Sequence, residues 1–247
     1  MLQIAGLWKS YSDCEVFRDV NLDVSPNQKI GILGPPGSGK TTLLRLILGL
    51  EDYQRGHIAI APGCWFGYLP QEEVPVGHYT VGDVLRTAEN DYCAIRNRPA
   101  ARQLAFGEFE AAEYRVPGLS YLRSKRELER ARTDILEGLG LGHLLWTYQM
   151  ASLQPDEQKR VWLASLLLAR PDVLVLDEPT VHLTDSTIEW LEGSLPKYAG
   201  TMLLVSSDLL LLDHLVDTLW KIDPHQHFVQ VCPGNHRTYL PGEKRVS

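Results

Sequence analysis

The sequence has few cysteines, no long hydrophobic run and no excess of positive charge. Its 247 residues include four scattered cysteines without a CxxC pair, which are Cys14, Cys64, Cys93 and Cys232. We therefore expect no disulfide framework, and we expect the cysteines to be reduced thiols of a cytosolic chain. The apolar stretches Trp162–Ala169 and Val173–Leu176 are separated by Arg170-Pro171-Asp172. Neither approaches the roughly 18 residues of a membrane span, so we expect no integral membrane segment.

Acidic residues outnumber basic ones by 31 to 24, which gives a net charge of -7. This balance argues against a dedicated nucleic-acid binder, although it leaves a local basic patch open. Residues Met1–Gly6 lack the charged and apolar regions of a secretory signal. The hydrophobic fraction of 44% is typical of a globular protein. The chain length predicts one large domain, or one domain with a helical insertion.

The hydrophobic pattern predicts strands that alternate with helices. Predicted strands lie within 1–33 (including Lys29–Leu33), at two places in 56–70 around Pro62-Gly63, and at 173–176, 202–205, 218–222 and 227–231. Predicted helices cover 41–50, 157–170, 186–195 and about 209–216. Residues 80–150 have helical spacing and few β-branched residues, which indicates a mainly helical subdomain. Ser25-Pro26-Asn27 fits either a hairpin or a tight loop. The alternation predicts a parallel sheet with helices on its faces.

A glycine-rich loop lies between a predicted strand and a predicted helix. Gly34-Pro35-Pro36-Gly37-Ser38-Gly39-Lys40-Thr41 matches the GxxxxGK[ST] pattern of a phosphate-binding loop. Such glycines let backbone N–H groups face phosphate oxygens, and the helix dipole favours an anion. Lys40 would reach the β- and γ-phosphates, and Thr41 would hold Mg²⁺. The alternative is a glycine turn before a buried helix, but the strand-loop-helix context favours phosphate binding.

Two carboxylates follow the apolar run Val173–Leu176. Asp177 and Glu178 stand at the end of this predicted buried strand. Beside a phosphate loop, Asp177 would bind the Mg²⁺ shell and Glu178 would polarise the attacking water. The alternative is a strand that simply leaves the core for solvent.

These motifs, taken in order, resemble those of an ABC ATPase (ATP-binding cassette) over almost the whole chain. Tyr11 stands where the family has an aromatic residue that stacks on adenine. Gly34–Thr41 resembles Walker A, and Leu176–Thr180 resembles Walker B with its following turn. Gln71 resembles the Q-loop glutamine, which contacts Mg²⁺ and the water. Taken alone, Tyr11 also fits a core aromatic residue and Gln71 a surface glutamine, but order and spacing favour the functional interpretation.

The resemblance implies an α/β P-loop NTPase fold, with an antiparallel β subdomain and a mainly helical subdomain, in a single domain over 1–247. It implies ATP and Mg²⁺ as ligands. The implied ATP contacts are Tyr11, Gly34, Pro35, Pro36, Gly37, Ser38, Gly39, Lys40, Thr41, Thr42 and Gln71. The implied metal ligands are Thr41, Gln71 and Asp177, with Glu178 as the catalytic residue.

Further segments are similar to the ABC-F subfamily, whose members lack membrane domains and mostly act on ribosomes. They are Thr180–Leu183, Ile188–Glu192, Tyr198–Thr201 and Pro233–Leu240. The helical subdomain, at about 80–155, leaves room for an arm of the kind that ABC-F proteins place on the ribosome. Six residues give this stretch a basic character: Arg115, Arg123, Lys125, Arg126, Arg130 and Arg132. A solvated helix face, with Glu127 and Glu129 in register, is an equal alternative.

Other positions depart from the family pattern. The signature LSGGEQ is replaced by Leu153–Gln158, so Gln154, Pro155, Asp156 and Glu157 form a degenerate signature. Ser207 stands at the switch-histidine position, and Thr184 stands where the D-loop aspartate is expected. We therefore expect weak hydrolysis and ATP-dependent pairing with a second ABC module, identical or different. The alternatives are a transporter's nucleotide-binding subunit and a regulatory module that does not hydrolyse ATP.

Overall fold

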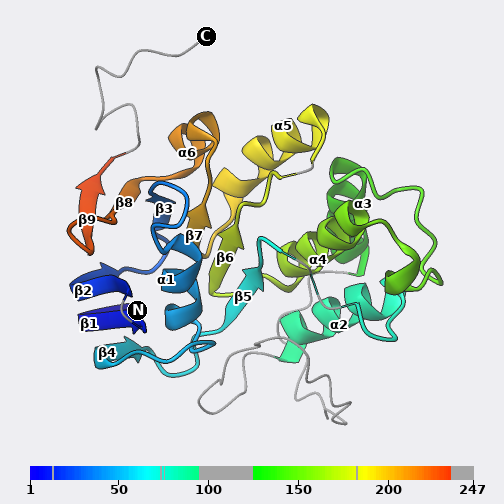
Figure 1. Cartoon of the computed structure of the whole chain (residues 1–247). Helices are drawn as coiled ribbons and strands as arrows, with labels where there is room; N and C mark the ends of the chain where they lie inside the picture. The colour runs from blue at the N-terminus through cyan, green and yellow to red at the C-terminus, as the bar shows by residue number, and fades with distance from the viewer. Residues whose placement is uncertain (13, 73, 75, 95–124, 182, 235–247) are drawn as a thin grey trace.

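The computed structural model describes residues 1–247 except 13, 73, 75, 95–124, 182 and 235–247 (Figure 1). The described chain forms a three-stranded antiparallel sheet, a six-stranded mixed sheet and a group of helices. The antiparallel sheet and the helices α2, α3 and α4 lie at opposite sides of the molecule in Figure 1.

The antiparallel sheet has the order β2-β1-β4. It consists of β1 (Leu2–Tyr11), β2 (Cys14–Val24) and β4 (Arg55–Ile60). Side chains of β1 alternate between buried and accessible, as one covered face requires. Gly56 has a φ of 103°, and a Cβ there would lie 2.4 Å from the carbonyl oxygen of Gly6. This close approach of two backbones requires glycine.

The six-stranded sheet has the order β5-β6-β7-β3-β8-β9. Its strands are β3 (Lys29–Leu33), β5 (Phe66–Leu69), β6 (Val173–Asp177), β7 (Thr201–Val205), β8 (Thr218–Asp223) and β9 (Phe228–Pro233). All neighbours are parallel except β8 and β9, which are antiparallel. The predicted parallel sheet is thus confirmed for five strands and extended by one antiparallel edge strand.

Two connections decide how the sheets are joined. Ser25-Pro26-Asn27 links β2 to β3, which belong to different sheets, so it is a tight loop and not a hairpin. The two strands predicted in 56–70 are β4 and β5, and they too belong to different sheets.

The six-stranded sheet separates two hydrophobic clusters. Val173 and Val175 of β6 pack in the cluster shared with β1, β2 and α1 (Lys40–Ile47). Leu174 and Leu176 point into the other cluster, which also contains α4 (Pro155–Ala169). This alternation follows from the two-residue period of a strand. On the second face lie α5 (Asp185–Ser194), the 3₁₀ turn η3 (Leu195–Lys197) and α6 (Leu209–Leu215).

Residues 80–155 contain helices, as predicted. They are α2 (Val81–Ala94), α3 (Lys125–Gly138) and the short 3₁₀ turn η2 (Met150–Ser152), which precedes α4. Of the six basic residues in the stretch predicted to leave room for an arm, Arg115 and Arg123 lie outside the described residues, whereas Lys125, Arg126, Arg130 and Arg132 belong to α3. Within the described ranges, none of the helices has both the length and the apolarity needed to cross a bilayer.

Candidate functional site

The glycine-rich loop connects β3 to α1 through backbone conformations that glycine adopts at low cost. Gly37 has a φ of 76°, and Gly39, with a φ of 97°, is the N-cap of α1. A Cβ on Gly39 would lie 2.6 Å from the Val16 side chain, and one on Gly34 would lie 2.4 Å from Ser38 Oγ. The loop is therefore packed closely against β2 and against itself, and at these positions glycine is the residue that fits.

The loop carries a cation and an unpaired buried hydroxyl. Lys40 Nζ donates to the carbonyl oxygens of Gly34 and Pro35, at 2.8 and 3.1 Å. Ser38 Oγ is buried and has no hydrogen-bond partner. Buried hydroxyls are normally paired, so this one marks a place for a ligand oxygen. A phosphate group would draw Lys40 from the loop carbonyls to its own oxygens.

Thr41 and Asp177 meet although they are far apart in the sequence. Thr41 Oγ1 donates to Asp177 Oδ2 at 2.7 Å. Asp177 is fully buried, and its other oxygen, Oδ1, has no partner. Burial raises the pKa of Asp177, and the nearby charge of Glu178 adds to this increase. Hydrogen bonding from Thr41 and the charges of Lys159 and Lys40 only partly oppose it.

A magnesium ion fits this pair chemically, because it takes hard oxygen ligands and would neutralise the buried carboxylate. Among the described residues there is no group of three or more His, Cys, Asp or Glu side chains that could hold a metal alone. The remaining ligands would have to come from phosphates and water, which is how Mg²⁺ is usually held in nucleotide sites.

Glu178 is buried next to Asp177 and is fixed by its neighbours. Its Oε2 accepts hydrogen bonds from the backbone N–H and the hydroxyl of Ser207, at 3.0 and 3.1 Å. Its own N–H donates to Val205 O at 2.9 Å. Its φ of 47° lies in the left-handed region, which is uncommon for a residue with a long side chain. Ser207 therefore stands beside the predicted catalytic carboxylate.

Gln71 and Tyr11 lie at the same site from two other elements. Leu69 pairs with Leu176 across β5 and β6, so Gln71 follows its strand next to Asp177 and Glu178. The Gln71 side chain is exposed. Tyr11, 45% exposed, places its hydroxyl 3.4 Å from Thr42 Oγ1. Lys9 Nζ lies 4.5 Å from the centre of the Tyr11 ring.

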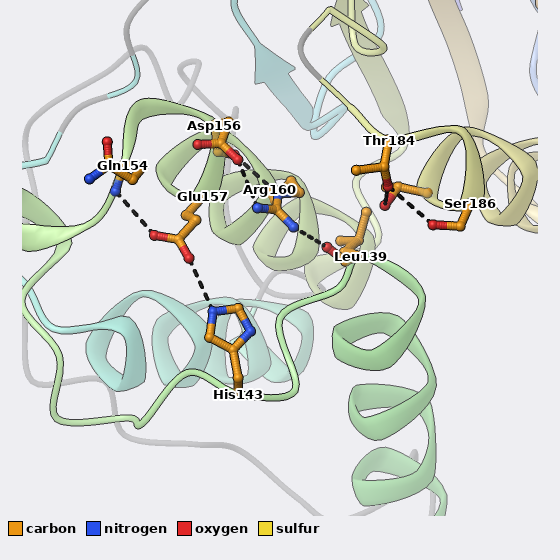
Figure 2. A network of polar contacts seen from close by, with 9 residues as sticks. Leu139, His143, Gln154, Asp156, Glu157, Arg160, Thr184 and Ser186 are labelled. Atoms are coloured by element: carbon orange, nitrogen blue, oxygen red, sulfur yellow. Dashed lines mark hydrogen bonds and ion pairs between the residues drawn. The ribbon is translucent and has the colours of Figure 1, made fainter.

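The degenerate signature forms a capped helix start (Figure 2). Pro155 begins α4, two residues earlier than predicted, and the Gln154 N–H donates to Glu157 Oε2 at 3.1 Å. Glu157 Oε1 also lies 3.1 Å from His143 Nε2. Asp156 pairs with Arg160 at 2.8 Å, and these contacts satisfy the helix start from within the chain (Figure 2).

The D-loop position begins a helix as well. Thr184 is the N-cap of α5, and its hydroxyl lies 3.1 Å from the Ser186 hydroxyl and 3.0 Å from that of Thr187. Asp185 is the first residue of α5. Within the described residues, no hydrogen bond joins Gln154–Glu157 or Thr184 to the phosphate loop.

One residue at the site was missed by the sequence analysis. Lys159 of α4 is buried, and its Nζ donates to the carbonyl oxygens of Gln71 and Glu178, at 3.3 and 3.0 Å. It stands in the charged run Asp156–Arg160, which is typical of a solvated helix start. No local pattern in the sequence of α4 distinguishes Lys159 from its charged neighbours Asp156, Glu157 and Arg160.

A separate open cavity of about 1010 Å³ lies at the other end of the sheet. Its lining includes Asp134, Trp190 and Tyr198, and none of the predicted site residues. The chemistry predicted from the sequence gathers instead at the carboxyl ends of β3 and β6.

The combination of a glycine loop at a helix start with a buried aspartate bonded to the loop threonine defines a P-loop nucleoside triphosphatase. The family model described as "ABC transporter" matches residues 17–181. The chain therefore belongs to the ABC ATPase family, as its motifs predicted.

Curated relatives cover the chain almost completely. It is 35% identical over 232 residues to the tylosin resistance ATP-binding protein TlrC of Streptomyces fradiae, which covers 90% of this chain and 42% of that protein. It is 30% identical over 239 residues to the energy-dependent translational throttle protein EttA of Haemophilus influenzae, covering 94% and 42%. Both are ABC-F proteins, which confirms that resemblance. The chain spans about two fifths of the length of these relatives.

Solved structures confirm the fold. The ATP-binding subunit of an ABC transporter superposes with a TM-score of 0.71 at 21% identity, covering 98% of this chain and 92% of that one. A dimeric ATP-binding cassette in a post-hydrolysis state, bound to ADP and Pi, gives 0.64 at 18% identity, covering 94% and 98%. At these identities the likeness concerns the fold alone.

Proposed function

We propose that this chain is an ABC-F-like module that binds MgATP, pairs with a second ABC module in response to ATP, and acts on a ribosome or ribonucleoprotein in the cytoplasm. The observation that carries ATP binding is the contact between Thr41 and Asp177, beside a loop whose Ser38 hydroxyl is buried and unpaired. Lys40 and the loop N–H groups would hold the phosphates. Thr41, Asp177 and Gln71 would hold Mg²⁺, and Tyr11 would stack on adenine.

The ribosomal part of the proposal rests on the relatives. EttA is named as a translational throttle protein, and TlrC as a resistance protein for tylosin. The ABC-F-like segments Thr180–Leu183 and Tyr198–Thr201 support the same assignment.

The degenerate signature supports slow turnover. Family members use the signature serine and glycines to direct donors at the γ-phosphate of a facing module. Here Pro155 has no N–H, Asp156 is an anion paired with Arg160, and Ser207 cannot become cationic. Glu178, the proposed general base, is present, so hydrolysis would be slow rather than absent.

A transporter's nucleotide-binding subunit is the second candidate. It is favoured by the match of residues 17–181 to the family model described as "ABC transporter". The two candidates differ in what the module sediments with.

Sedimentation of Glu178→Gln with MgATP tests both candidates. If the proposal is correct, this variant pellets with ribosomes through a sucrose cushion when ATP is present, and Lys40→Ala does not. Recovery with the membrane fraction, and none with ribosomes, would establish the transporter alternative.

Slow turnover is tested by restoring the signature. A protein that combines Gln154→Ser, Pro155→Gly, Asp156→Gly and Ser207→His should hydrolyse ATP at least about tenfold faster, because the barrier falls by about 1.4 kcal/mol. An unchanged rate with intact ATP binding would mean that these residues never face a nucleotide in a pair of identical chains.

A further inference from the structure

Lys159 joins the helix that begins at the signature to the two segments that carry the predicted hydrolytic side chains. It is only 8% exposed, and its ammonium group donates to Gln71 O at 3.3 Å and to Glu178 O at 3.0 Å. Both acceptors are backbone carbonyls at the carboxyl ends of adjacent strands, β5 and β6. A buried ammonium is retained only where its donors are well used.

The next residue along the helix shows that this connection is particular to Lys159. Arg160 also has a long cationic side chain, but it donates to Leu139 O at 3.0 Å and pairs with Asp156 at 2.8 Å. It therefore ties α4 to the end of α3 and to its own first turn (Figure 2). Lys159 instead reaches out of the helical region to the site.

The backbone of Glu178 needs such an anchor. With a φ of 47°, it is in a conformation that persists only where its surroundings hold it. Its N–H is held by Val205, its carboxylate by Ser207 and its carbonyl by Lys159. The other donor near that carbonyl, the Val181 N–H, is at 3.5 Å and therefore weak.

We propose that Lys159 is a positioning residue for ATP hydrolysis. By holding the carbonyls of Gln71 and Glu178 with one ammonium group, it fixes the spacing of these residues, so that the glutamine and the glutamate face the same water. The proposal rests on the ATPase activity proposed above. It predicts an effect on the chemical step, with little effect on ATP binding, because the hydrogen bonds of the Lys159 ammonium group in the described structure go to Gln71 and Glu178 and not to the phosphate loop.

The test compares Lys159→Met with the matched control Arg160→Met, which removes a neighbouring cation and its carbonyl hydrogen bond. Turnover, KM, ATP affinity by titration and melting temperature are measured for both. We expect kcat of Lys159→Met to fall at least about tenfold, with ATP affinity within about twofold of the wild type. Arg160→Met should change kcat by less than about threefold. Lys159→Arg, which keeps the donors, should recover part of kcat.

Three outcomes are decisive against the proposal or part of it. If kcat falls equally in Lys159→Met and Arg160→Met, and in proportion to the fall in their melting temperatures, Lys159 is a structural residue only. The proposed ATPase activity would be unaffected by this result. A loss of ATP affinity in Lys159→Met that matches its loss of kcat would also contradict a positioning role in the chemical step. Wild-type turnover no higher than that of Glu178→Gln would instead overturn the proposed hydrolysis, and the role of Lys159 with it. If Lys159→Met does not fold, Lys159→Gln, which keeps an amide donor without the charge, replaces it.

Discussion

The phosphate loop and the signature region treat their polar groups in opposite ways. Around the loop, Ser38 Oγ and Asp177 Oδ1 are buried without a partner. At the signature, Glu157 bonds to Gln154 and His143, and Asp156 pairs with Arg160 (Figure 2). One region leaves polar atoms for a ligand, whereas the other has satisfied them from within the chain. The difference indicates that motif residues lost from a sequence can be replaced by a locally stable helix start with its own cap.

Glu178→Gln should have the largest effect. Removing the general base while keeping the shape is expected to lower turnover by roughly 10²–10⁴-fold. ATP affinity should be retained, because the phosphate loop is unchanged. Phosphate release and equilibrium titration measure the two quantities. A variant with wild-type turnover would show that the hydrolytic base lies elsewhere.

Lys40→Ala should weaken ATP binding about tenfold or more, because it removes a charge-assisted contact of roughly 1.5–3 kcal/mol. Asp156→Asn, from the signature region, is the comparison and should leave the affinity of the unpaired chain unchanged. Calorimetric titration of dilute protein distinguishes the two. Equal affinities for wild type and Lys40→Ala would contradict the assignment of the phosphate site.

Asp177→Asn should stabilise the nucleotide-free protein at neutral pH. Folding raises the pKa of Asp177, chiefly through burial, so its contribution to stability is greatest below its unfolded pKa of about 3.9 and is lost as the pH rises through the folded pKa. Each kcal/mol regained would raise the melting temperature by about 2–4 °C. Melting curves from pH 4 to 7.5 should show that the difference in melting temperature between Asp177→Asn and the wild type becomes smaller as the pH falls.

The same Asp177→Asn protein should lose the magnesium dependence of ATP binding, because a neutral amide is a poorer ligand for a divalent cation. The stability prediction would be contradicted by a melting temperature of Asp177→Asn below that of the wild type at pH 7. Such a result would indicate that the negative charge of the buried carboxylate is already compensated by groups of the chain.

Glu157→Ala should have the smallest effect. It removes one half of the reciprocal helix cap, worth about 1 kcal/mol, and so lowers the melting temperature by about 2–4 °C. ATP affinity should not change. Any loss of ATP affinity would connect the signature region to the phosphate loop within one chain and would remove the contrast between them.

Much of the site could be predicted because its chemistry is local in the sequence. The GxxxxGK[ST] pattern and the apolar run ending in Asp177 and Glu178 each indicate functional residues at the end of a strand. Helix and strand positions were also predictable, since burial imposes a period on each. Sheet membership was not, because β4 and β5 are both short and only long-range pairing assigns them to different sheets.

Lys159 could not be predicted for a related reason. In sequence it is one charged residue among Asp156, Glu157 and Arg160. Its burial is decided by how α4 packs across β5 and β6, which no local pattern encodes. The Thr41–Asp177 contact could be predicted only because both residues were assigned to the Mg²⁺ site, since 136 positions separate them in the sequence.

The position of β3 also determines when the site can form during synthesis. This strand, which delivers the phosphate loop, lies between β7 and β8, and its partners are residues 202–205 and 218–221. A nascent chain that ends before residue 202 would carry the complete loop motif on a strand with both edges unpaired, which is prone to misassociation. Truncations or destabilising changes within β7 and β8 should therefore abolish nucleotide binding although they touch no residue of the loop.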